Sequence, residues 1–212
     1  MTTALVDIQS GNLHSVENAL RAAGAEDVVV TADPDIVFAA DRVVLPGVGA
    51  FGACAANLRA VDGLENALEN VVFSRGRPFL GICVGMQLMA EYGEEHGTHD
   101  GLSWIAGSVR KLRPSRSGWL WRRGNERVPH MGWNDVIPCD GLTLLTPGEA
   151  YFLHSYAYVN GQTDDPVIAV TDHGGPVTAA VQVETAIGVQ FHPEKSQRYG
   201  IELLARFLAW RP

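Results

Sequence analysis

The stretch Arg77–Ala90 constrains the fold more than any other part of this sequence. Pro78–Gly81 is apolar and ends in glycine, as the end of a buried strand does, and Met86–Ala90 consists of good helix formers. Cys83 lies between them, with a glycine two residues away on either side. This is the pattern of a nucleophile elbow, in which glycines leave room beside a strained residue. A helix that begins at the sulfur would also favour thiolate over thiol.

A second motif lies near the C-terminus. An apolar run that is typical of a strand ends at His192, where Pro193 stops strand pairing, and Glu194 follows. Taken alone, Cys83 is equally consistent with a small buried hydrophobic residue, and a histidine at a strand end is commonly just hydrogen-bonded. A cysteine nucleophile, however, needs a base, and the base needs a third group to hold its ring and tautomer. Together, Cys83, His192 and Glu194 predict a catalytic triad.

Length and charge exclude several classes of protein. The 212 residues suit a single α/β domain over 1–212, and 46% hydrophobic with 19% charged residues is ordinary for a globular chain. A net charge of −8 argues against nucleic-acid binding. The densest basic run, Arg110–Arg116, precedes Trp119 and Trp121, and in so acidic a chain it indicates a solvated loop or part of a protein interface rather than an RNA site.

The sequence also indicates the compartment. It has no basic-then-apolar leader and no apolar run near the roughly 18 residues of a membrane span, so we expect no membrane association. Three widely spaced cysteines suggest neither a disulfide framework nor a zinc site. A reducing cytoplasm fits both this count and thiolate chemistry.

Periodicity predicts an α/β fold with an open, mainly parallel sheet flanked by helices and with antiparallel additions at one edge. The first half alternates strands and helices, whereas residues 108–191 contain short strands separated by glycine, proline, asparagine and aspartate. The expected elements are strands at 4–8, 28–31 and 42–45, a helix at 13–23, helical pieces over 51–73 that meet near Asp62–Gly63, a strand, elbow and helix over 78–92, and a final helix at 197–210.

Gly81–Gln87, taken with Gln190–Glu194, resembles the class I, or triad, glutamine amidotransferases. More narrowly, the chain resembles the glutaminase subunits of imidazole glycerol phosphate synthase, which act in histidine biosynthesis. The resemblance covers essentially the whole chain, because further matching segments follow in family order: Asp7–Val16, Pro46–Gly52, His130–Asn134, Phe152–Tyr156 and Lys195–Ser196.

The resemblance implies roles for residues near the triad. Backbone N–H groups of Val84 and of Val48 or Gly49, the latter after a peptide flip, would hold the oxyanion. The residues expected to bind glutamine are Gln87, Ser155, Tyr156 and Gly47, and those expected at the partner interface are Asn12, Trp133, Asn134 and Lys195. Asn12 is also expected to tie the first loop to the oxyanion loop, and a helix N-cap is an alternative reading of it.

The remaining histidines and cysteines are assigned no chemistry. His130 and His154 lack the short spacings of zinc ligands, so we expect no metal and no cofactor. The other four histidines outside the triad (His14, His96, His99 and His173) are predicted to be surface residues, and Cys54 and Cys139 are predicted to pack.

The implied reaction is hydrolysis of glutamine to glutamate and ammonia, which a separate (β/α)₈ cyclase subunit in a heterodimer would receive. The alternatives are another triad amidotransferase subunit, a stand-alone cysteine hydrolase of γ-glutamyl amides, or a catalytically silent binding module. The segment Arg113–Arg127 departs from the family pattern, being longer and more aromatic.

Overall fold

The computed structural model describes residues 1–114, 127–139, 144–161 and 166–212. Residues 115–126, which make up most of the atypical Arg113–Arg127 segment, lie outside the described residues, and so do two short segments at 140–143 and 162–165. The first half contains β1 (Thr2–Val6), α1 (Leu13–Ala22), β2 (Asp27–Thr31), α2 (Pro34–Ala39), β3 (Arg42–Gly47), α3 (Phe51–Arg59), α4 (Leu64–Glu69), a π-helical turn (Asn70–Ser74), β4 (Phe79–Cys83), α5 (Val84–Gln87), β5 (Ala90–Gly93), β6 (His99–Asp100) and β7 (Ile105–Lys111).

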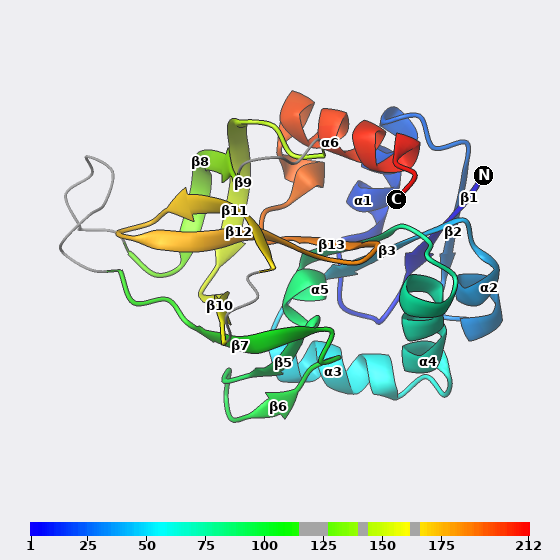
Figure 1. The fold of residues 1–212 in the computed structure, drawn as a ribbon, viewed down its shortest axis with the longest axis horizontal. Coiled ribbons are helices and arrows are strands. Elements are labelled where there is room, and N and C mark those ends of the chain that lie inside the picture. The colour runs from blue at the N-terminus through cyan, green and yellow to red at the C-terminus, as the bar shows by residue number, and fades with distance from the viewer. Residues whose placement is uncertain (115–126, 140–143, 162–165) are drawn as a thin grey trace.

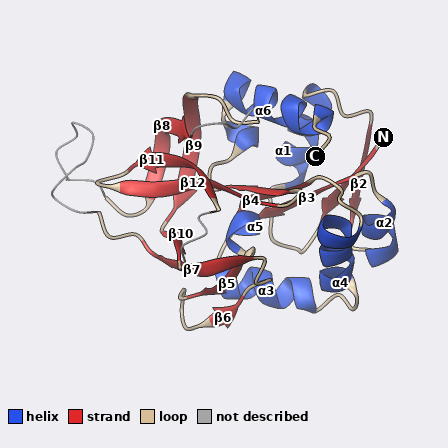
Figure 2. Ribbon diagram, in the orientation of Figure 1, coloured by secondary structure: helices blue, strands red, loops and turns tan. Residues whose placement is uncertain are grey.

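The second half is mainly strands, as the punctuation predicts. It contains β8 (His130–Pro138), β9 (Gly148–His154), β10 (Tyr156–Asn160), β11 (Val167–Asp172), β12 (Pro176–Val183), β13 (Ala186–Val189), a 3₁₀ turn (Pro193–Lys195) and α6 (Gln197–Ala209). Figure 2 shows the strands through the middle of the molecule, with helices above and below them.

The main sheet has the order β2-β1-β3-β4-β13-β12-β11-β8-β9. Pairing is parallel from β2 to β13 and antiparallel from β13 to β9. The predicted open α/β sheet with antiparallel strands added at one edge is therefore confirmed. Helices α1 and α6 cover one face, and α3, α4 and α5 cover the other (Figure 1).

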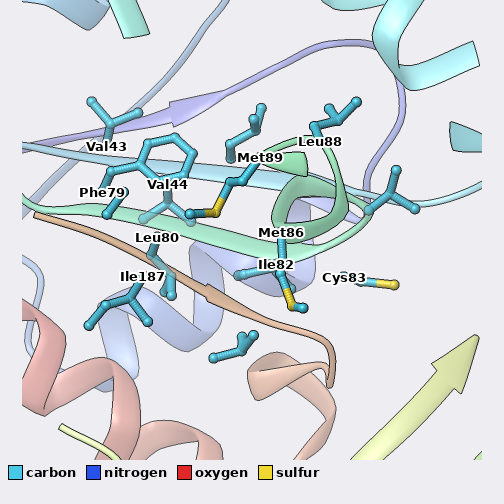
Figure 3. Packing of buried hydrophobic residues seen from close by; sticks show 14 of the residues in the cluster. Val43, Val44, Phe79, Leu80, Ile82, Cys83, Met86, Leu88, Met89 and Ile187 are labelled. Atoms are coloured by element: carbon cyan, nitrogen blue, oxygen red, sulfur yellow. The ribbon is translucent and has the colours of Figure 1, made fainter. Parts of the chain in front are cut away.

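The parallel strands are buried because helices cover both faces, which is why they read as continuous apolar runs. Figure 3 shows the centre of this core, in which Val44, Leu80 and Ile187 come from three neighbouring strands and lie in register. The same core carries the end of β4, and so it supports Cys83 rigidly.

One prediction about local structure was wrong, and one helix was missed. The helix expected to run to Tyr92 ends after one turn, because Ala90–Gly93 pairs instead with β7 in a second sheet of order β10-β7-β5-β6. Tertiary pairing there overrides helix propensity. The missed helix, α2, begins at Pro34: the Asp33 carboxylate accepts the Asp35 N–H and caps it.

Two side chains also lie elsewhere than predicted. His173, expected at the surface, is buried against the His130 ring, with 4.1 Å between ring centroids. Cys139, expected to pack, is exposed. Among the described residues, no helix is long and apolar enough to cross a bilayer.

Candidate active site

Cys83 lies at a strained turn between β4 and α5. Its φ is +54°, a value that non-glycine residues rarely adopt, and its side chain is almost completely buried. Because α5 is a single helical turn, it carries little of the dipole that the sequence led us to expect at the sulfur.

Glycines make the turn possible by close packing of backbone. A Cβ placed on Gly81 would lie 2.7 Å from the carbonyl oxygen of Gly85, and one on Gly85 would overlap the carbonyl oxygen of Leu45. Gly47, expected to bind substrate, is packed in the same way: its Cβ would lie 2.8 Å from the Gly85 nitrogen. Gly47 thus packs directly against the backbone of the elbow at Gly85.

His192 and Glu194 approach Cys83 from the neighbouring strand. β13 pairs in parallel with β4, so the residues that follow β13 reach the same edge of the sheet as Cys83. His192 Nδ1 lies 2.8 Å from Glu194 Oε1, and both side chains are buried. The other nitrogen, Nε2, is left for Cys83.

The His192 ring is basic. Burial lowers its pKa, but hydrogen bonds with Cys83 and Glu194, together with their charges, outweigh burial and raise the pKa to about 9. The ring therefore carries a proton at neutral pH, and its Nε2 is placed to donate to Cys83. The other carboxylate oxygen of Glu194, Oε2, is buried and has no hydrogen-bond partner among the described residues.

The expected oxyanion loop faces partly away from the sulfur. The Val48 N–H donates to the Ser10 carbonyl oxygen at 3.3 Å, so it is not available to an oxyanion in this conformation. The Val48 carbonyl oxygen accepts from Cys54 Sγ at 3.5 Å. Since N–H and C=O of one trans peptide point in opposite directions, the Gly49 N–H points away from Cys54.

A pocket of about 330 Å³ brings most of the predicted site residues together. Gly47 and Trp133 are not part of its wall, and neither is Asn134. The wall is formed by Asn12, Val48, Gly49, Cys83, Val84, Gln87, Leu153, His154, Ser155, Tyr156, His192 and Lys195. A larger cavity, about 890 Å³, lies against β7 and β10 and contains no residue of the predicted triad.

The predicted interface residues lie in different surroundings. Trp133 is 45% exposed, whereas Asn134, the next residue of β8, is buried and donates to the Asp172 carbonyl oxygen at 2.8 Å. Strand alternation explains the difference. Lys195 lies with its ammonium 6.0 Å from the centre of the Tyr151 ring.

Two residues beside the predicted triad were missed by the sequence analysis. Gln190 is completely buried, and its Nε2 lies 3.6 Å from Cys83 Sγ. Its Oε1 accepts from Gln87 Nε2 at 3.0 Å. His154 lines the pocket and was considered only as a metal ligand. The available signal was that Gln190 stands two residues before His192 in a run expected to be a strand, where alternation puts such side chains on one face. In the structure β13 ends earlier, at Val189, so both residues lie in the segment beyond the strand.

His130 and His154 form a buried neutral pair. His130 Nδ1 lies 3.1 Å from His154 Nε2. Burial, reinforced by the neighbouring histidines, lowers the pKa of His130 to about 3. Burial also lowers the pKa of His154 to about 4, although the Tyr156 carbonyl opposes the shift. Within the described ranges, no group of three histidine, cysteine or carboxylate side chains could hold a metal.

This pair makes a prediction about stability in acid. Below pH 6.5 the unfolded chain binds protons that folded His130 and His154 exclude, so stability falls as pH drops, by about 2 kcal/mol per histidine at pH 5. His192, whose pKa is raised to about 9, contributes stability that is fully present below pH 6.5 and is lost as the pH rises toward 9. We expect a fall in Tm between pH 7.5 and 5.0 that is roughly 4–8 °C smaller in His154→Asn. Equal falls would contradict the neutral pair.

Comparison with known proteins identifies the class. The family described as "Glutamine amidotransferase class-I" matches residues 4–210. Among solved structures, one described as a glutamine amidotransferase has a TM-score of 0.72 at 17% identity, covering 97% of each chain, and PurLQS from Thermotoga maritima has a TM-score of 0.70 at 17% identity, covering 98% of this chain and 97% of that one. At that identity the structures show the fold alone.

Curated relatives are much nearer in sequence. Imidazole glycerol phosphate synthase subunit HisH of Zymomonas mobilis is 56% identical, over all of this chain and 97% of the relative. The HisH subunit of Rhodopseudomonas palustris is 50% identical, over the full length of both chains. The protein is therefore a class I glutamine amidotransferase. Within that class, it belongs to the family of imidazole glycerol phosphate synthase subunit HisH.

Proposed function

We propose that this chain is the glutaminase subunit of imidazole glycerol phosphate synthase and hydrolyses glutamine to glutamate and ammonia with a triad of Cys83, His192 and Glu194. One observation carries the proposal. A strained, buried Cys83 shares a pocket with His192, whose ring is held by Glu194 at 2.8 Å. That is the arrangement of nucleophile, base and orienting group that acyl transfer needs.

In the first half of the reaction, the Cys83 thiolate attacks the side-chain carbonyl carbon of glutamine. The tetrahedral intermediate then expels the amide nitrogen, which takes the proton from His192 Nε2 and leaves as ammonia. Because Nδ1 is committed to Glu194, the proton on Nε2 points into the pocket. A basic His192 suits this step, since the ring is charged before the nitrogen leaves.

The oxyanion would take hydrogen bonds from two backbone N–H groups. The Val84 N–H is one, because the first N–H groups of a helix have no partner within it. The second would come from Val48 or Gly49. For Val48 this requires the peptide to turn and leave the Ser10 carbonyl, which would account for low activity in the isolated chain.

The second half returns the enzyme to its starting state. Neutral His192 removes a proton from water, and the hydroxide attacks the thioester carbon. Glutamate leaves, and the sulfur departs as thiolate beside a protonated ring. Gln87, Ser155 and Tyr156 surround this space as parts of the pocket wall, which supports their expected role in holding glutamine.

Ammonia needs an acceptor outside this chain. We place residues 1–212 in one glutaminase domain in the cytoplasm and propose that a separate cyclase subunit receives the ammonia in a heterodimer. Asn12 and Lys195 border the pocket, and Trp133 is exposed nearby on the β8–β9 hairpin, which supports an interface around the pocket mouth.

The decisive measurement is glutamate release by the purified chain, alone and with the cyclase subunit and its nucleotide ligand. We expect a rise of roughly tenfold to a hundredfold when both are added, because their binding favours the turned peptide. Equal rates in all conditions would favour a stand-alone hydrolase. If no glutamate were released in any condition, the proposed glutaminase activity would be refuted.

A further inference from the structure

Gln190 contacts the sulfur of Cys83 from inside the protein. Its side chain is 0% exposed, and its Nε2 lies 3.6 Å from Sγ. The orientation of its amide matters, because an amide nitrogen donates a hydrogen bond and an amide oxygen only accepts one. Contacts with Gln87 and Tyr156 determine which of the two faces the sulfur.

The Tyr156 carbonyl oxygen fixes the orientation of both glutamines. A backbone carbonyl can only accept, so the Gln87 atom 2.9 Å from it must be Nε2. The second N–H of that nitrogen then donates to Gln190, so the Gln190 atom 3.0 Å away must be Oε1. Gln190 Nε2 is left facing Cys83 Sγ, where the sulfur must accept. A thiolate accepts such a bond much better than a thiol does.

The same carbonyl is held from its other side by histidines. His154 Nδ1 lies 2.9 Å from the Tyr156 oxygen and therefore carries the proton. Neutral His154 then accepts at Nε2 from His130 Nδ1, 3.1 Å away. His130 in turn accepts at Nε2 from the amide of Asn134, at 3.1 Å. Asn134 is fixed by the Asp172 carbonyl and by the Asp135 N–H.

Every donor and acceptor along this chain of hydrogen bonds has one possible direction. We infer that Gln190 is a catalytic residue that donates a hydrogen bond to the Cys83 thiolate, and that Gln87, His154, His130 and Asn134 are positioning residues that hold its amide in that orientation. The inference rests on the proposed function, in which Cys83 is the nucleophile. It gives Gln87 a role in orienting Gln190, in addition to its place in the pocket wall.

Burying the polar side chains of this chain of hydrogen bonds gains the protein little stability by itself. Five polar side chains are removed from water here, and each satisfied bond replaces one to solvent with little net gain. Apolar side chains of similar volume would pack the same space. A donor directed at Sγ, by contrast, has a use, because hydrogen bonds to charged groups are about twice as strong as those between neutral groups.

The test is the pH profile of Cys83 alkylation by iodoacetamide in the full chain, followed by mass spectrometry of the Cys83 peptide. Gln190→Met keeps the length of the side chain and removes the donor. We expect the midpoint of its profile to rise by about one to two pH units. We also expect kcat for glutamine, measured with the cyclase subunit and ligand, to fall about 10- to 100-fold, with KM within about threefold of wild type.

Three further variants separate positioning from packing. Gln190→Glu keeps the acceptor for Gln87 and should raise the midpoint at least as far, because a carboxylate repels a thiolate. His130→Leu should raise it by a smaller amount, and His130→Asn should restore it, because asparagine can donate from the place of Nδ1. Gln182→Met, on β12 and half-exposed, is the control and should match wild type.

The profile also separates this inference from the proposed function. His154, His192 and Lys195 line the pocket, and the Cys54 thiol, with a pKa raised to about 11 by burial, lies behind it. All of them stay in place in the Gln190 variants, so a shift reports on residue 190. Wild-type midpoints and kcat in folded Gln190→Met and Gln190→Glu would overturn the inference and leave the glutaminase intact. If the wild-type protein itself released no glutamate, the proposed function would be refuted instead.

Discussion

Replacing Cys83 with alanine is expected to lower glutamate release by about 10⁴-fold or more, measured with the cyclase subunit and its nucleotide ligand present. Without the sulfur no thioester forms, and His192 and the oxyanion donors cannot substitute for it, because members of a triad act as one unit. The fold should remain, since alanine is smaller than cysteine and fits the buried position without a clash.

Cys139→Ala is the matched control. Cys139 is exposed and lies outside the pocket, so its removal should leave the rate within about twofold of wild type. A Cys83→Ala protein that keeps more than a few per cent of the rate, with an unchanged circular dichroism spectrum, would show that Cys83 only packs. The binding-module alternative predicts instead that neither the wild-type protein nor Cys83→Ala releases glutamate.

The second large effect is expected on stability, at Gly85. Alanine favours a helix over glycine by about 1 kcal/mol, so helix propensity alone would make Gly85→Ala stabilising. Its Cβ, however, would overlap the carbonyl oxygen of Leu45 in β3, and a backbone atom in the centre of a sheet cannot move aside. Overpacking of this kind costs about 3 kcal/mol or more, so the net effect is destabilising.

Thermal unfolding followed by circular dichroism tests this balance. We expect the Tm of Gly85→Ala to fall by roughly 4–8 °C, or the protein to accumulate as aggregate. Gly11→Ala is the control: its Cβ would meet Pro46 Cγ at 3.4 Å, an ordinary contact, and its Tm should stay close to wild type. A Gly85→Ala protein as stable as wild type would mean that the elbow tolerates a Cβ and that the glycine spacing carries no structural information.

Much of the fold and the outline of the site could be predicted from local pattern. Cys83 between flanking glycines ends β4, and His192 before Pro193 lies just beyond the end of β13. Parallel strands that are neighbours present their carboxyl ends at one edge. The apolar runs predicted the buried parallel strands for the same physical reason: each must bury both faces. These features depend on residues close together in sequence.

Only the tertiary structure decided which distant groups meet. The second sheet converted Ala90–Gly93 from helix to strand, since β7 supplied hydrogen-bond partners that no local pattern records. Gln190 was read as part of a motif, and its contact with Cys83 appeared only when β4 and β13 came together.

Amide orientation and histidine tautomer are set in the same way, by what lies opposite each atom. The direction of the Gln190 amide follows from the carbonyl of Tyr156, and the neutral state of His130 and His154 follows from burial beside one another. By itself, the sequence predicted the proposed nucleophile and base and the sheet that carries them. The protonation states and the directions of the hydrogen bonds were determined by the packing of distant segments, because both depend on burial and on the partner atom rather than on residue type.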